Sequence, residues 1–162
     1  MQILHQKQIS QKIKRLAIQV LENNYDENEL IIAGINNNGL RFANLIVDEL
    51  KKMAIGKVIT LTSIRLNPAN PVGTEVTIDL PVESLNGKTI LIVDDVANTG
   101  RTIFYAVKPL LSILPKKIET IVLVDRKHKA FPIAITYYGI SLATTFQEHI
   151  DVNLDEPAVY LV

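Results

Sequence analysis

Three short runs dominated by aliphatic residues constrain the fold of this chain more than any other feature. A run without regular polar alternation suits a strand that is buried on both faces, as in a parallel sheet. Between the runs, apolar side chains recur at three- and four-residue steps, which predicts amphipathic helices. The predicted strands are 30–35, 90–93 and 118–124, and the predicted helices are 6–24, 40–53 and 101–114. This alternation predicts an α/β fold with a central parallel sheet of about five strands flanked by helices.

The central run leads directly into two adjacent carboxylates, Asp94 and Asp95. Ligands of open α/β sheets bind at the carboxyl ends of the strands, so this pair is expected at a binding edge. Carboxylates accept hydrogen bonds, which suits the hydroxyl groups of a sugar or a metal-bound ligand.

The turn Ala97–Gly100 follows the acid pair, and a helix is expected from Arg101. A turn into a helix offers free backbone N–H groups and a positive dipole end, which suit a phosphate. Thr99 and Thr102 add hydroxyl donors. A sugar phosphate is one ligand that needs both the acid pair and the turn.

The stretch Val93–Thr102, VDDVANTGRT, resembles the phosphoribosyl-pyrophosphate (PRPP) signature of type I phosphoribosyltransferases. The resemblance implies that Asp94 and Asp95 hold the ribose hydroxyls and act in catalysis. It also implies a 5′-phosphate site in the turn that follows. The substrate-binding residues expected there are Val96, Ala97, Asn98, Thr99, Gly100, Arg101 and Thr102.

The run 30–35 ends in a second small polar segment, Asn36, Asn37, Asn38 and Gly39, which is predicted to be a loop before the helix 40–53. Asn and Gly tolerate positive φ, which lets N–H groups turn toward an anion. The resemblance implies that this segment is the pyrophosphate loop. Relatives in the pyrimidine-regulator branch usually carry Thr-Arg-Gly there, whereas this chain has no basic residue. Arg41 is a candidate replacement; the alternative is an ordinary exposed helix arginine.

A strand is predicted over 57–64, followed by Arg65 and by a loop, Leu66–Val72, that contains two Asn-Pro pairs. A short strand over 75–79 would return as an antiparallel ribbon. The resemblance implies that the loop closes over the ligand and that Arg65 acts in catalysis by contacting pyrophosphate. The alternative is a surface arginine beside a turn.

The strand 118–124 delivers a charged segment, Asp125–Lys129, to the same edge as Asp94. Residues 122–129, with Phe131-Pro132-Ile133 and 137–139, resemble the pyrimidine-operon attenuator/uracil phosphoribosyltransferase branch. Arg126 is the candidate ligand contact in this segment, and a solvated basic run is the alternative. Residues 140–162 are expected to form a small hood over the site.

The resemblance implies transfer of ribose 5-phosphate from PRPP to a nucleobase, with release of pyrophosphate. Mg²⁺ is expected to be carried mainly by PRPP, so no set of protein metal ligands is predicted. Uracil is the expected acceptor and a purine is an alternative. A second alternative is a PRPP- or nucleotide-sensing regulator that binds RNA and has weak catalysis. The equal numbers of basic and acidic residues, 17 each, argue against RNA binding.

With 162 residues, the whole chain, 1–162, is expected to be a single domain. It contains no cysteine, which excludes disulfides, thiolate metal sites and a cysteine nucleophile. The N-terminal segment has no apolar signal core, and no long apolar run occurs, so a cytoplasmic protein without a membrane partner is expected. The resemblance further implies a homo-oligomer, most simply a dimer.

Overall fold

The computed structural model describes residues 1–145 and 147–162 and is built around one six-stranded sheet in the order β4–β3–β2–β5–β6–β7. The strands are β2 (Glu29–Ile35), β3 (Val58–Arg65), β4 (Thr77–Ile78), β5 (Thr89–Ala97), β6 (Lys117–Arg126) and β7 (Tyr137–Leu142). Every neighbouring pair is parallel except β3 with β4. The expectation of about five strands is therefore corrected to six. The additional strand is β4, which runs back along β3 and forms the predicted antiparallel ribbon with it.

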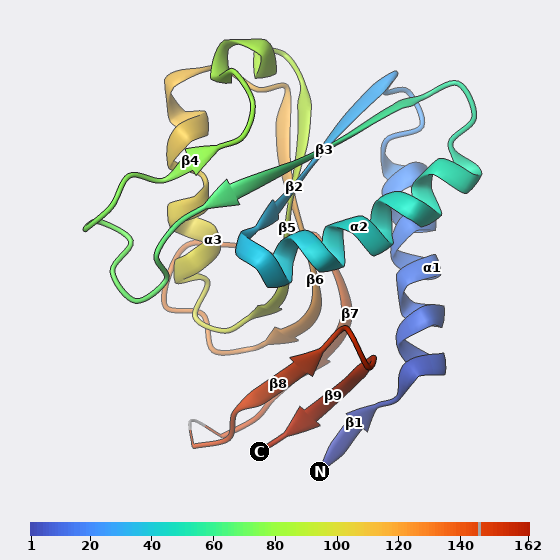
Figure 1. Cartoon of the computed structure of the whole chain (residues 1–162), viewed down its shortest axis with the longest axis vertical. Coiled ribbons are helices and arrows are strands. Elements are labelled where there is room, and N and C mark those ends of the chain that lie inside the picture. The colour runs from blue at the N-terminus through green and yellow to red at the C-terminus, as the bar shows by residue number, and fades with distance from the viewer. Residues whose placement is uncertain (146) are drawn as a thin grey trace.

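Helices cover both faces of this sheet (Figure 1). The long helices α1 (Gln6–Asn23) and α2 (Asn36–Met53) lie on one face, and α3 (Arg101–Ala106) lies on the other. Two short 3₁₀ helices, η1 (Val82–Leu85) and η2 (Lys108–Ser112), complete the α3 side. Alternate residues of β5 enter two separate cores: Leu91 packs in the α1/α2 cluster, whereas Ile90 and Ile92 pack in the α3 cluster. The central runs are continuously aliphatic because both faces of the strands are buried.

Two predicted helix boundaries are wrong. The helix expected over 101–114 ends at Ala106, and η2 continues the segment. Pro109 explains the break, because its ring has no N–H to donate and clashes with the carbonyl group one turn earlier. The second error concerns Asn36–Gly39, which form the first turn of α2 instead of a loop.

A second sheet lies at one end of the molecule and includes the N-terminal segment (Figure 1). It contains β1 (Gln2–Leu4), β8 (Ile150–Asn153) and β9 (Ala158–Leu161), in the antiparallel order β1–β9–β8. The predicted start of the hood at residue 140 is wrong, because residues 140–142 belong to β7 of the main sheet. Phe146, inside the expected range, lies outside the described residues. Among the described helices, none is both long enough and apolar enough to cross a membrane.

Candidate active site

Two adjoining pockets lie at the carboxyl ends of β2 and β5. The first, with a volume of about 400 Å³, is formed mainly by the turn between β5 and α3. The second, about 350 Å³, is formed by the start of α2 and by the acid pair. Asp94, Thr102 and Pro68 line both pockets. The two pockets therefore meet at the carboxylate that the sequence predicted to be central.

The turn after β5 brings the predicted phosphate-binding residues together. β5 continues through the acid pair to Ala97, so the carboxylates lie within the strand and not after it. All seven predicted residues, 96–102, line the first pocket. Gly100 allows the reversal, because its φ of 84° lies in the left-handed region. A side chain at this position would also press on Ile133, since an added Cβ would lie 3.3 Å from the Ile133 Cβ.

The acid pair has an unusual electrostatic environment. Burial raises the pKa of Asp94 well above 3.8, and the charge of the adjacent Asp95 raises it further. The Asp95 N–H donates to the Asp94 carboxylate at 2.9 Å, and the Val96 N–H donates to the Asp95 carboxylate at 2.9 Å. A ligand that supplies donors or a cation to this pair would relieve the repulsion between the two charges.

The start of α2 is packed tightly against β5. A Cβ added to Gly39 would lie 2.6 Å from the Val93 carbonyl oxygen, so only glycine fits this approach. Asn36 makes the sharp entry into the helix with a φ of 51°, which is uncommon for a residue other than glycine. Its side-chain amide donates to the Leu66 carbonyl oxygen at 2.9 Å and accepts from the Leu66 N–H at 3.1 Å. Asn36 thus ties the loop after β3 to the second pocket.

The other predicted pyrophosphate contacts lie at this pocket or beside it. Asn37 and Asn38 are exposed and line the second pocket. Arg65, the last residue of β3, donates to the Asn37 side-chain oxygen at 2.9 Å. Arg41 instead pairs with Asp155 at 2.9 Å. Among the described residues, no cation lines the second pocket.

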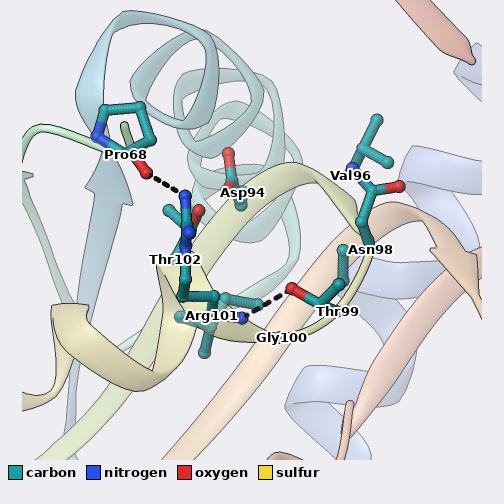
Figure 2. A pocket seen from close by; sticks show the side chains of 10 residues that line it. Pro68, Asp94, Val96, Asn98, Thr99, Gly100, Arg101 and Thr102 are labelled. Atoms are coloured by element: carbon teal, nitrogen blue, oxygen red, sulfur yellow. Dashed lines mark hydrogen bonds between the residues drawn. The ribbon is translucent and has the colours of Figure 1, made fainter. Parts of the chain in front are cut away.

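Two arginines, Arg101 in the lining of the first pocket and Arg126 beside it, are held by other parts of the protein. Arg126 is only 8% exposed and donates to the Thr144 hydroxyl, the Asn98 side-chain oxygen and the Thr145 carbonyl oxygen. Arg101 donates to the Pro68 carbonyl oxygen at 2.6 Å, as Figure 2 shows. The Arg101 side chain therefore holds the loop after β3 over the site.

Sequence reasoning missed the contribution of Pro68 to both pockets. The predicted loop 66–72 could have indicated this contribution, because a loop that closes over a ligand places some of its residues in the wall of the pocket. The described residues include no group of three or more His, Cys, Asp or Glu side chains arranged to hold a metal ion. The two carboxylates beside these pockets still suit Mg²⁺, which commonly binds through one or two carboxylates together with substrate phosphates.

Known proteins resemble this chain in both sequence and structure. Residues 1–157 match the family model described as a phosphoribosyl transferase domain. A bifunctional protein PyrR from Microcystis aeruginosa is 35% identical, covering 96% of this chain and 90% of that protein. A bifunctional protein PyrR from Clostridioides difficile is 34% identical, covering 96% of this chain and 91% of that protein.

Solved structures share the fold at lower sequence identity. The hypoxanthine phosphoribosyltransferase of Trypanosoma cruzi superimposes with a TM-score of 0.80 and 15% identity, covering 99% of this chain and 94% of that one. A hypoxanthine-guanine phosphoribosyltransferase from Bacillus anthracis gives a TM-score of 0.73 at 20% identity, covering 90% and 85%. The predicted phosphoribosyltransferase fold is confirmed. The chain belongs to the phosphoribosyl transferase domain family and, within it, to the group that contains the bifunctional PyrR proteins.

Proposed function

We propose that PRPP binds across the two pockets and that uracil is the base that displaces its pyrophosphate. The observation that carries this proposal is the junction of the pockets at Asp94 and Thr102. A phosphate in the first pocket and a pyrophosphate in the second would place the ribose between them, beside the acid pair. Asp94 and Asp95 would then accept hydrogen bonds from the ribose hydroxyls.

The reaction forms a bond between a ring nitrogen of the base and the anomeric carbon of PRPP. The bond from that carbon to the pyrophosphate oxygen breaks, and the base nitrogen loses its proton to solvent. The ribose ring becomes positively charged in the transition state, so two nearby carboxylates stabilise it. Arg101 and Asn36 hold the loop 66–72 over the site, which helps to exclude water.

The pyrophosphate pocket depends on few protein charges. Asn37, Asn38 and the N–H groups at the start of α2 would bind the leaving group as neutral donors. Arg65, beside Asn37, is the cation positioned to reach it. Mg²⁺, carried mainly by PRPP, would neutralise the departing charge, and the acid pair would assist in holding it.

Uracil is proposed from the resemblance of residues 122–129, 131–133 and 137–139 to the uracil phosphoribosyltransferase branch. The test is a panel of nucleobases incubated with PRPP and Mg²⁺ while pyrophosphate release is followed. Uracil should give the nucleotide, and Asp95→Asn should abolish turnover. Correctly folded protein that converts no common base would refute the proposal, and a purine as best substrate would replace uracil.

A second candidate function is RNA binding in response to a nucleotide. No cation among the described residues lines the pyrophosphate pocket, and a pocket without a cation fits a regulator with weak catalysis. The relatives named bifunctional PyrR support the same reading. The test is a mobility-shift assay with a structured pyrimidine-operon leader RNA, with and without the uracil nucleotide. Binding that the nucleotide strengthens and that weakens with salt is expected. No shift at low salt would exclude this function.

A further inference from the structure

The turn that lines the first pocket is held from behind by the segment that follows β6. The Lys129 ammonium group donates to the Asn98 carbonyl oxygen at 3.0 Å. The N–H groups of Ala130 and Phe131 both donate to the Thr99 carbonyl oxygen, at 2.9 Å and 3.2 Å. Two successive carbonyl groups of the turn are therefore fixed by residues that do not line the pocket.

Fixing these carbonyl groups also fixes two N–H groups. In a planar trans peptide, the N–H of each residue points opposite to the carbonyl group of the residue before it. The Thr99 and Gly100 N–H groups must therefore point away from Lys129 and its neighbours. No hydrogen bond between described residues uses these two N–H groups. Both residues line the first pocket, so the N–H groups are available to an anion there.

Lys129 is itself held firmly in place. Its ammonium group also donates to the Asp125 carboxylate at 2.6 Å and to the Arg126 carbonyl oxygen at 2.5 Å. The two charged side chains are only 23% and 16% exposed. The stem of Lys129 lies over the turn, since a Cβ added to Gly100 would be 3.4 Å from the Lys129 Cδ. All three donors of the ammonium group have acceptors, and one of those acceptors is the turn.

We propose that Lys129 is a positioning residue for the 5′-phosphate of PRPP. It acts through the backbone, because anchoring the Asn98 carbonyl group keeps the adjacent N–H groups directed into the first pocket. This inference rests on the proposed function, which places that phosphate in the first pocket. Removing the ammonium group should loosen the turn and weaken PRPP binding, while uracil binding and the chemical step should change little.

The experiment compares wild-type protein with Lys129→Met, Lys129→Arg and the control Lys127→Met. Lys127 is exposed on the same segment, and its side chain makes no hydrogen bond or ion pair among the described residues. Hydrogen–deuterium exchange of the peptide covering 97–103 reports the order of the turn without any ligand. Exchange in β2 serves as the folding reference. Steady-state kinetics then give KM for PRPP, KM for uracil and kcat.

Lys129→Met should speed exchange in the turn and raise KM for PRPP about tenfold, the size expected for one hydrogen bond from a charged group. The values of kcat and KM for uracil should stay within about twofold of wild type. Lys129→Arg should recover most of the loss, and Lys127→Met should behave like wild type. Unchanged exchange or unchanged KM for PRPP in Lys129→Met would overturn the inference. Wild-type protein that fails to bind PRPP would refute the proposed function instead, and the exchange data would still decide the effect of Lys129 on the turn.

Discussion

Replacing Asn36 tests how the second pocket is assembled. The Asn36 side chain makes two hydrogen bonds with the Leu66 backbone, at 2.9 Å and 3.1 Å, from a backbone φ of 51°. Each hydrogen bond contributes about 0.5–1.5 kcal/mol net, so losing both costs about 1–3 kcal/mol. Holding alanine in the left-handed region costs about 1–2 kcal/mol more. Asn36→Ala should therefore lower the free energy of unfolding by about 2–5 kcal/mol.

Asn36→Gly is the matched variant. It loses the same hydrogen bonds but tolerates the positive φ, and its greater freedom in the unfolded chain costs about 0.5–1 kcal/mol. The glycine variant should therefore be at least as stable as the alanine variant, by a margin of about 0–1.5 kcal/mol. Equilibrium unfolding in urea, followed by circular dichroism, measures both differences. The reasoning fails if Asn36→Ala loses less than about 1 kcal/mol, or if the glycine variant is the less stable of the two.

Substitutions at three further positions, and the pH dependence of the wild type, probe the site. Burial and the charge of Asp95 raise the folded-state pKa of Asp94, so the stability of the wild type falls as pH rises through that pKa. Asp94→Asn should remove this loss, so above that pKa it should unfold at a higher urea concentration than wild type, and it should lose turnover. Because ionisation of Asp94 supplies the acceptor proposed for the ribose hydroxyls, PRPP affinity of the wild type should increase as pH rises through the raised pKa of Asp94, and calorimetry showing no such trend would contradict a role for the ionised carboxylate. Gly39→Ala should lower the free energy of unfolding, measured in urea, by about 1–3 kcal/mol and should raise KM for PRPP, because the new methyl group would clash with the Val93 carbonyl oxygen. Arg126→Met should lower the free energy of unfolding by about 1.5–3 kcal/mol. Arg126→Lys should not recover this stability, because lysine lacks the planar guanidinium group that donates to three acceptors. A lysine variant as stable as wild type would argue against this geometry.

Much of the site could be predicted because its chemistry is contiguous in the chain. The acid pair and the turn that follows occupy one stretch, 94–102, so their approach needs only a strand and a turn. The meeting of this stretch with Asn36–Gly39 also follows from the fold class, since parallel strands present their carboxyl ends at one edge.

Other features could not be predicted, because they depend on contacts between distant segments. Arg101 reaches Pro68, 33 residues away, and Arg41 reaches Asp155, 114 residues away. Arg101 and Arg41 were singled out by their proximity in sequence to the signature and to the loop, and that proximity gives no sign of these long-range partners. The three-residue strand β1 was missed for a related reason: it is too short to show a period and forms only against β9.

The sequence by itself determined the class of fold and the central strands, and it predicted the candidate phosphate and ribose contacts that the fold gathers around the two pockets. These features follow from local patterns: continuous burial of aliphatic runs and the chemistry of adjacent side chains. The tertiary structure decided which basic side chains pair with distant parts of the protein. Lys129 illustrates the difference, because its role rests on lying behind the turn at Asn98, a placement set by packing between β5 and the segment after β6.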